Sequence, residues 1–363
     1  MSADKQATIV DVAKTAGVSV ATVSRVLSGG SASAAARKKV EDAVLSLNYR
    51  PSPPAKVQEK ITGRALALVI SDLTNPYYAA LCAGAEEAAR RSGWPLVLYQ
   101  TALTGWMEDT IAARVSELPV MGAVLVGNTI EAGTPEEIRQ RLNQISRKMP
   151  IVTIGPKVDG VNCTNITSDL SLSVRKSISH LYALGHRRIS FIGGLGGVRS
   201  SNARRRAYYE EMERLGLPAD NETSSDSGFT PQAGETCLNR LLSGLPRANW
   251  PTAVIAINDL VALGALRQLQ RMQVRVPEDM ALIGCDNQFF TPYLNPPLTT
   301  VDLHPYDHGV SAVEELLSAI RGAGGVYSQI RECSLIVRES CGALLGVRSF
   351  PRPGGQTVDA PSV

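Results

Sequence analysis

Two short apolar stripes at helical spacing stand near the start of the chain. The positions of the stripes are Val12, Ala13 and Ala16, followed by Val23, Val26 and Leu27. Between them, Gly17 can adopt the left-handed backbone of a helix end, and Ser19 is a good cap for the next helix. A run of roughly 20 residues is too short to bury a core alone. The pattern therefore predicts a two-helix unit within a larger structure.

The second predicted helix leaves a small, partly apolar face with one basic residue toward solvent. The outward positions are Val20, Ala21, Thr22, Ser24 and Arg25. An Arg can reach guanine or a phosphate, and hydroxyls such as those of Ser19 and Thr22 suit phosphate oxygens. The pattern fits a helix-turn-helix that places its second helix in the DNA major groove. An ordinary solvated helical hairpin produces the same periodicity.

From residue 65 onward, apolar runs alternate with helical stretches. Strands are predicted at 65–70, 96–100, 122–126, 151–154, 188–192, 253–256 and 281–284, and helices at 78–92, 106–117, 135–147, 170–184, 203–215, 232–242 and 259–272. This alternation predicts an α/β fold with parallel sheets covered on both faces. Because the pattern occurs as two successive sets, it predicts two similar lobes. In such folds ligands bind beyond the carboxyl ends of the strands, here in a cleft between the lobes.

Composition adds a weak electrostatic signal. Residues 1–60 hold nine Lys and Arg against five Asp and Glu, a net charge of +4, and the remainder of the 363 residues carries −1. A basic N-terminal region on a near-neutral body suits attraction to phosphate, although a chance excess of a few charges gives the same numbers. A hydrophobic content of 44% supports a sizeable core.

Several protein classes are disfavoured. No apolar run approaches the ~18 residues of a membrane span, and the first residues lack a signal-peptide segment, so we expect a cytoplasmic protein. The six cysteines are scattered without a C-x-x-C pair and are expected to be free thiols. His304 and His308 have the spacing of a helical metal pair, but Pro305 between them favours a loop or helix start. We expect no cofactor, no metal and no catalytic residues, since neither a Ser/His/Asp arrangement nor a phosphate-loop motif is present.

The motifs DVA, AGVS and TVSRVL, with NYRP at residues 48–51, make the first run specific. Together they resemble the N-terminal headpiece of the LacI/GalR family of bacterial transcription regulators. The body resembles the same family at 72–78, 180–194, 251–266, 276–287, 296–301 and 337–340. The resemblance covers roughly residues 8–341 and implies the fold of periplasmic sugar-binding proteins for the body.

This resemblance implies a domain plan. We expect a helix-turn-helix headpiece at 1–50, a hinge linker at 51–63, a two-lobed effector-binding and dimerisation domain at 64–342 and a disordered tail at 343–363. Lobe 1 is expected at about 64–161 and 292–326, and lobe 2 at about 162–291 and 327–342. The chain would then cross between the lobes near Val161, Thr291 and Val326.

The resemblance also assigns DNA contacts. The expected DNA-binding residues are Thr8, Ser19, Val20, Ala21, Thr22, Ser24, Arg25, Ser33, Ser52 and Lys56. A third helix is expected at about 33–47, with Val40, Val44, Leu45 and Leu47 as its apolar side. Ala36 stands where the family usually has a Thr, which removes one expected phosphate contact. In the hinge, Gln58 occupies the position of a family Leu that wedges into the minor groove, and Pro53 precedes another Pro, so we predict a weaker hinge helix and less DNA bending.

Six cleft positions are carried over from the family as ligand-binding residues: Tyr77, Tyr78, Arg204, Phe229, Asn258 and Asp286. The carboxylate and the amide suit sugar hydroxyls, and the Arg suits an anionic or carbonyl group. Two alternatives stay open: Asn258 with Asp259 could simply cap the following helix, and any Arg of 204–206 could point inward. The glycine-rich stretch 193–197 lacks the order of a phosphate loop and favours a flexible loop at the cleft edge.

The leading hypothesis is a sequence-specific DNA-binding regulator, by family habit a repressor. A sugar-like metabolite between the lobes would alter the spacing of the two headpieces of a homodimer and thereby its affinity for double-stranded operator DNA. The alternative is a solute-binding protein of the periplasmic-binding-protein fold without a DNA function. An enzyme on an α/β fold is a third, weaker hypothesis.

Overall fold

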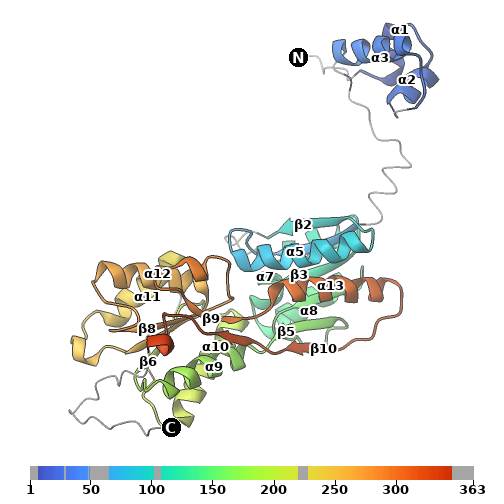
Figure 1. The fold of residues 1–363 in the computed structure, drawn as a ribbon. Coiled ribbons are helices and arrows are strands. Elements are labelled where there is room, and N and C mark those ends of the chain that lie inside the picture. Colours follow the sequence, from blue (N-terminus) through green and yellow to red (C-terminus); the bar gives the residue numbers. More distant parts are fainter. Residues whose placement is uncertain are drawn as a thin grey trace, which may run out of the picture. The chain divides into compact units, whose positions relative to one another are not determined.

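The computed structural model describes residues 7–27, 30–47, 49, 65–101, 108–219 and 228–345. The chain divides into two compact units, residues 1–62 and 63–363, each of which is described by itself (Figure 1). The predicted contacts of Ser52 and Lys56, the wedge position Gln58 and tail residues 346–363 lie outside the described residues.

The N-terminal unit holds the helices α1 (Ile9–Ala16), α2 (Val20–Leu27) and α3 (Ala34–Ser46). Each helix contributes one fully buried valine to a common core, namely Val12, Val23 and Val40. Gly17 has φ 64° and ends α1, as its lack of a Cβ allows. One predicted core residue was wrong: Leu45 is 79% exposed. It lies about 100° around the helix from Val44, and Ala43 is buried in the core instead.

The first lobe is built on a parallel sheet of strand order β10-β5-β4-β3-β1-β2. Its strands are β1 (Ala65–Ile70), β2 (Leu96–Gln100), β3 (Val120–Val126), β4 (Ile151–Ile154), β5 (Thr164–Ser168) and β10 (Ser328–Arg331). Its helices are α5 (Pro76–Arg91), α6 (Glu108–Ser116), α7 (Asn128–Glu131), α8 (Pro135–Ser146) and α13 (Pro305–Ile320). Side chains of β1 alternate: Leu66 and Leu68 pack toward α5 and α13, whereas Ala67 and Val69 pack toward α6 and α8.

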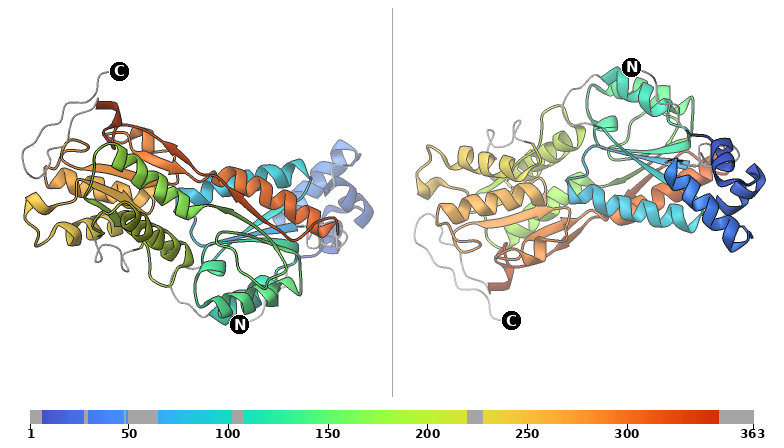
Figure 2. Two further views of the ribbon diagram at one scale, coloured as in Figure 1. Left: turned by 90° about the horizontal axis from the view of Figure 1, so that it is seen from below. Right: turned by 90° about the horizontal axis from the view of Figure 1, so that it is seen from above.

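Helices α5 and α13 lie side by side on one face of this sheet, as Figures 1 and 2 show. Glycines allow their close approach. A Cβ added at Gly84 would lie 2.0 Å from the carbonyl oxygen of Tyr306, and one at Gly309 would lie 2.1 Å from that of Leu81. The start of α13 is thereby held against α5, and both helix starts reach the same end of the lobe.

The second lobe has a sheet of strand order β11-β9-β8-β7-β6. Its strands are β6 (Ile189–Ile192), β7 (Ala253–Ala256), β8 (Ala281–Cys285), β9 (Thr299–Asp302) and β11 (Ser334–Ile336), and only β11 pairs antiparallel. Its helices are α9 (Leu170–Ala183), α10 (Arg199–Arg214), α11 (Pro231–Leu242) and α12 (Asp259–Arg271). The two parallel-sheet lobes confirm the predicted fold class.

The expected crossing points near Val161, Thr291 and Val326 were wrong, because each crossing lies later in the chain. Strands β5 and β10 belong to the first sheet and β9 to the second, so the chain crosses after Ser168, Asp302 and Arg331. Accordingly, lobe 1 does not end at residue 161 and lobe 2 does not begin at 162. These strands read TNITS, TTVD and SQIR, and such polar sequences carry no apolar run that sequence analysis could recognise.

Candidate DNA-contacting helix and ligand cleft

Helix α2 presents the predicted outward face. Val20 is 42% exposed, and Ala21, Ser24 and Arg25 are exposed as well, while Val23 and Val26 are buried on the opposite side. The Ser19 hydroxyl accepts a hydrogen bond from the Thr22 backbone N–H at 3.1 Å and lies 2.9 Å from the Thr22 hydroxyl. The helix start is therefore capped, and Val20, Ala21, Ser24 and Arg25 face away from the buried side of the helix.

Two predicted phosphate-binding hydroxyls begin the neighbouring helices. The Thr8 hydroxyl accepts from the Asp11 N–H at 3.3 Å, and the Thr8 backbone N–H donates to the Asp11 carboxylate at 2.8 Å, which closes a capping box. The Thr8 hydroxyl also donates to this carboxylate at 2.6 Å. The Ser33 hydroxyl accepts from the Ala36 N–H at 3.2 Å. Both the oxygen and the hydrogen of the Thr8 hydroxyl are therefore bonded at the start of α1. The Ser33 oxygen accepts one hydrogen bond, and its hydroxyl hydrogen is left to donate to a phosphate. Both positions have a structural role that the sequence analysis did not assign.

A cavity of about 640 Å³ lies between the two lobes of the C-terminal unit. The start of α5, with residues just before it, and the start of α13 line it from the first lobe. From the second lobe it is lined by the loop after β8 and by Asp302 at the end of β9. These are carboxyl ends of strands and amino ends of helices, as expected for a ligand site in this class of fold.

Asp286, the first residue after β8, lines this cavity and is 6% exposed. Its φ of 111° turns the chain sharply out of the strand. Burial raises the pKa of its carboxyl to about 7, against the opposing effects of the Arg204 charge and of a hydrogen bond from Gln288. A carboxyl with a pKa near neutrality can donate or accept a hydrogen bond, depending on its proton.

Asp259 lies close to Asp286 and is fully buried. Its carboxyl accepts from the Thr300 hydroxyl at 2.6 Å and from the Gln288 backbone N–H at 2.8 Å. Burial, followed by the nearby Asp286 charge, raises its pKa well above the ordinary value. Asp259 therefore holds the loop after β8 in place from inside the lobe.

Arg204 is the inward member of its triplet. It is 8% exposed, and its Nη1 donates to the Ile257 carbonyl at 2.9 Å, while its Nε has no partner among the described residues. Arg205 is half-buried, and the exposed Arg206 pairs with Glu210, with an Nε–Oε1 distance of 3.7 Å. The geometry thus resolves which guanidinium lies near Asp286.

The two predicted tyrosines differ in position. Their rings are 5.4 Å apart and nearly perpendicular, but only Tyr77 lines the cavity. The Tyr78 hydroxyl bonds to Ser71. Burial, together with neighbouring carboxylates, raises the pKa of both phenols, so each remains a neutral hydroxyl. Tyr77 is the better placed of the two to contact a ligand.

Asn258 and Phe229 do not reach the lining of this cavity. The Asn258 Oδ1 accepts from the Val261 N–H at 2.9 Å, which caps α12, and its Nδ2 donates to the Phe229 carbonyl at 3.1 Å. The Phe229 side chain packs against the core of the second lobe. The capping alternative for Asn258 is therefore what the geometry shows.

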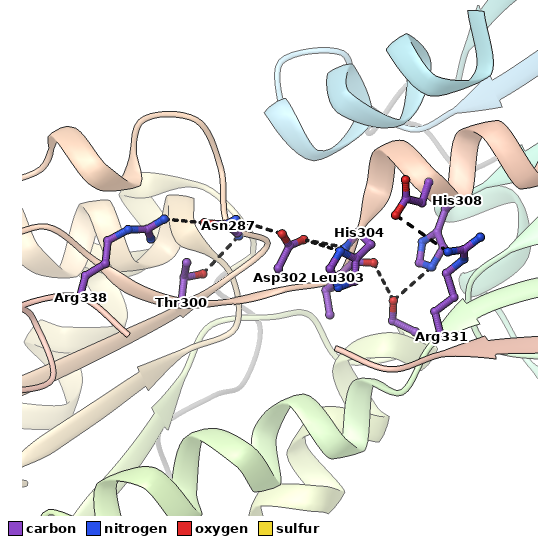
Figure 3. Close-up of polar contacts among 10 residues, drawn as sticks. Asn287, Thr300, Asp302, Leu303, His304, His308, Arg331 and Arg338 are labelled. Carbon is purple, nitrogen blue, oxygen red and sulfur yellow. Dashed lines mark hydrogen bonds and ion pairs between the residues drawn. The ribbon is translucent and has the colours of Figure 1, made fainter. Parts of the chain in front are cut away.

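A chain of polar contacts runs from the loop after β8 to the points where the chain crosses between the lobes (Figure 3). Arg338 Nη2 donates to Asn287 Oδ1 at 2.8 Å, and Asn287 Nδ2 donates to Asp302 at 3.0 Å. Asp302 in turn accepts from the His304 backbone N–H at 2.7 Å. The loop at the ligand cavity is thereby joined to the second crossing.

At the first crossing, Ser168 contacts residues of the second crossing segment and of α13. Its hydroxyl donates to the Leu303 carbonyl at 2.8 Å and lies 3.3 Å from the Nε2 of the buried His308 (Figure 3). Burial lowers the pKa of His308 to about 4, and the nearby Arg331 charge acts in the same direction. A neutral imidazole thus sits where all three crossing segments meet.

Sequence reasoning missed Asn75, Gln288 and Asp302, which border the cavity or join its walls. Gln288 Nε2 donates to Asn75 Oδ1 at 3.1 Å, a contact between the two lobes. The only available signal was the polar run of residues 286–288 after an apolar strand. Nothing in the sequence indicated that this run faces the start of α5.

Comparisons with known proteins fit both units. Residues 8–52 match the family model of bacterial regulatory proteins of the lacI family, and residues 178–341 match that of a periplasmic binding protein-like domain. The chain is 31% identical to the transcriptional repressor CytR of Escherichia coli K12 over 349 residues, 95% of this chain and 100% of CytR. It is 32% identical to the repressor PurR of Haemophilus influenzae PittEE over 354 residues, 93% of this chain and all of PurR.

Among solved structures, the transcriptional regulator CelR in complex with cellobiose aligns with a TM-score of 0.66 and 29% identity, covering 92% of this chain and 99% of CelR. The chain belongs to the lacI family of bacterial regulatory proteins. It is accordingly a DNA-binding transcription regulator with an effector-binding domain, and a solute-binding protein without a DNA function is not favoured. Within the described residues, no helix is both long and apolar enough to span a membrane.

Proposed function

We propose that this regulator represses transcription as a homodimer on double-stranded operator DNA and that a sugar-like metabolite between the lobes changes its operator affinity. The observation that carries the proposal is the cavity of about 640 Å³ bounded by both lobes, in a chain that also holds an exposed helix of the helix-turn-helix type. The similarity to CelR, solved with cellobiose, supports a sugar-like ligand. The protein acts by binding, without catalysing a reaction.

Helix α2 enters the major groove. Arg25 contacts guanine or phosphate, Val20 and Ala21 approach base edges, and the hydroxyl of Ser24 contacts the backbone. Ser33, at the start of α3, adds a phosphate contact through its remaining donor.

In the cleft, Asp286 and Tyr77 contact the ligand directly, since both line the cavity. Arg204 lies near Asp286, and its positive charge favours the ionised form of that carboxyl, because it lowers the pKa that burial raises. Asn258 acts as a structural cap. A ligand held between Asp286 and Tyr77 favours one relative position of the lobes.

The signal travels through the crossings. The contacts from Asn287 through Asp302 to His304 join the ligand loop to the segment before α13, and Ser168 joins that segment to the first crossing. A small rotation of the lobes alters the separation of the two headpieces in the dimer. Because half-sites on DNA have a fixed spacing, the rotation changes operator affinity.

The test is selection of bound duplexes from a random DNA library by the full-length protein, followed by affinity measurements at several salt concentrations. The proposal predicts one enriched palindromic sequence, and the logarithm of the binding constant for it should fall linearly with the logarithm of salt concentration. A protein that enriches no sequence, or whose enriched site lacks two half-sites, contradicts the proposal.

A further inference from the structure

The side chain of Gln288 lies in the wall of the ligand cavity and is 5% exposed. Its Nε2 donates to Asn75 Oδ1 at 3.1 Å and to Asp286 Oδ2 at 3.4 Å. Its Oε1 is buried and has no hydrogen-bond partner among the described residues. Within this carboxamide, the NH₂ group is therefore hydrogen-bonded, whereas the carbonyl oxygen is not.

The orientation of this carboxamide follows from Asn75. Asn75 caps α5, and its Oδ1 accepts from the Tyr77 backbone N–H at 3.0 Å. The atom that faces Gln288 is therefore an acceptor, and Gln288 must turn its NH₂ group toward it. Because the NH₂ group has both of its contacts, the unpaired atom is the carbonyl oxygen. A buried acceptor without a donor is unfavourable, and a ligand N–H or O–H would satisfy it.

The same wall is rich in acceptors and poor in positive charge. The carboxyl groups of Asp286 and Asp302 line the cavity beside Gln288, and Asp307 adds a third. Neither lysine nor arginine is among the described residues that line this cavity, and His304 is its one basic residue there. Arg204 lies near Asp286 but donates to the Ile257 carbonyl and does not line the cavity. An anionic ligand would therefore meet like charges in this wall, whereas a neutral or cationic donor would be attracted.

We propose that the effector is an uncharged or cationic molecule that presents two neighbouring hydrogen-bond donors, one to Gln288 Oε1 and one to the Asp286 carboxyl. Gln288 is then a specificity-determining residue that excludes phosphorylated and carboxylated analogues. This inference rests on the proposed effector function of the cleft. Two chemical groups can supply such a donor pair: vicinal hydroxyls, or an amine next to a hydroxyl. The probes below distinguish these two groups.

The test measures binding of matched pairs to the full-length protein by isothermal titration calorimetry at pH 7.5. The pairs are cellobiose and cellobionate, ribose and ribose 5-phosphate, and adenosine and adenosine 5′-monophosphate, with glucosamine against glucose for the amine. We expect at least one uncharged or cationic member to bind and its anionic partner to bind at least about tenfold more weakly. An anionic member that binds equally well or better, or a panel in which nothing binds, overturns the inference.

Two variants test the role of Gln288. Gln288→Met keeps the length of the side chain but removes the acceptor, and it should weaken binding of the preferred probe about tenfold. Gln270→Met makes the same exchange at an exposed residue of α12 that does not line the cavity, and binding should stay within about threefold of wild type. Equal losses in the two variants, or no loss in Gln288→Met, contradict a direct contact. Melting temperatures without ligand confirm that both variants fold.

Operator binding by the same preparations distinguishes a failure of the inference about ligand charge from a failure of the proposed function. If wild-type protein binds its operator and responds to an anionic probe, the inference about ligand charge fails while the proposed function stands. If no operator is bound under any condition, the proposed function itself fails.

Discussion

The headpiece and the ligand cleft place their functional residues in opposite ways. In the headpiece, the side chains that we propose for base contacts share one eight-residue helix, and the core residues that hold it are within the same short unit. In the cleft, Asn75, Asp286 and Asp302 come from distant parts of the chain and meet only because three crossings bring the lobes together. A site on one helix is visible in sequence periodicity, whereas a site built across lobes depends on topology.

The strongest test of the contrast is to unfold one region alone. Val23→Asp places a carboxylate in the headpiece core, where none of the described residues is a buried cation that could pair with it, and should abolish operator binding completely. The main melting transition of the two-lobed unit should remain within about 2 °C of wild type, since the cores are separate. Calorimetry of the same sample checks this. A matching loss in the body's transition would show that the regions do not fold independently.

In the cleft, the pH dependence of stability should report on Asp286. Its folded pKa of about 7 lies above the ordinary value of 3.8, so the folded state binds the proton more tightly. This contribution to stability is full below about pH 4 and is lost as the pH rises to 7, by about 1.4 kcal/mol per unit at most.

Asp286→Asn should flatten the dependence in that window, as measured by urea unfolding at a series of pH values. Arg206→Ala, which removes an exposed charge from the same lobe, is the control and should leave the slope unchanged. An unaltered slope in Asp286→Asn would contradict the raised pKa.

Within the headpiece, Arg25→Ala should weaken operator binding by about 1–3 kcal/mol, roughly fivefold to 150-fold. Ligand binding in the cleft should not change. Fluorescence anisotropy with the selected operator gives the DNA affinity, and Arg206→Ala again controls for the lost charge. Equal affinities for Arg25→Ala and wild type would remove Arg25 from the interface.

The smallest expected effect is that of a helix cap. Thr8→Ala opens the capping box with Asp11 and should destabilise the headpiece by about 1 kcal/mol. Hydrogen exchange of the α1 amides measures this loss directly. If exchange were unchanged while operator affinity fell, Thr8 would act as a phosphate contact, as the sequence analysis expected.

The two-lobed fold could be predicted because apolar strands such as 65–70 and 281–284 are hydrophobic throughout, as parallel strands buried on both faces are. The crossings could not, because strands TNITS, TTVD and SQIR are polar. Leu45 shows a second limit: an apolar residue next to a helical stripe is indistinguishable from the stripe until the helix packs.

The cleft shows the same division. Asp286 follows an apolar strand and was identifiable, because strand ends carry ligand sites in this fold. Gln288 owes its importance to Asn75, more than 200 positions earlier in the chain, and no local pattern reports that contact. Asn258 has the residue type of a ligand contact but is held as a cap by Val261.

We infer that this chain couples a DNA-contacting helix around Arg25 to a ligand cleft around Asp286. The most direct measurement is operator affinity against concentration of the preferred probe, for wild type and Asp286→Asn. We expect the operator affinity to shift at least about fivefold in wild type and not at all in Asp286→Asn. An operator affinity that does not respond to the bound probe, or that responds equally in Asp286→Asn, would contradict it.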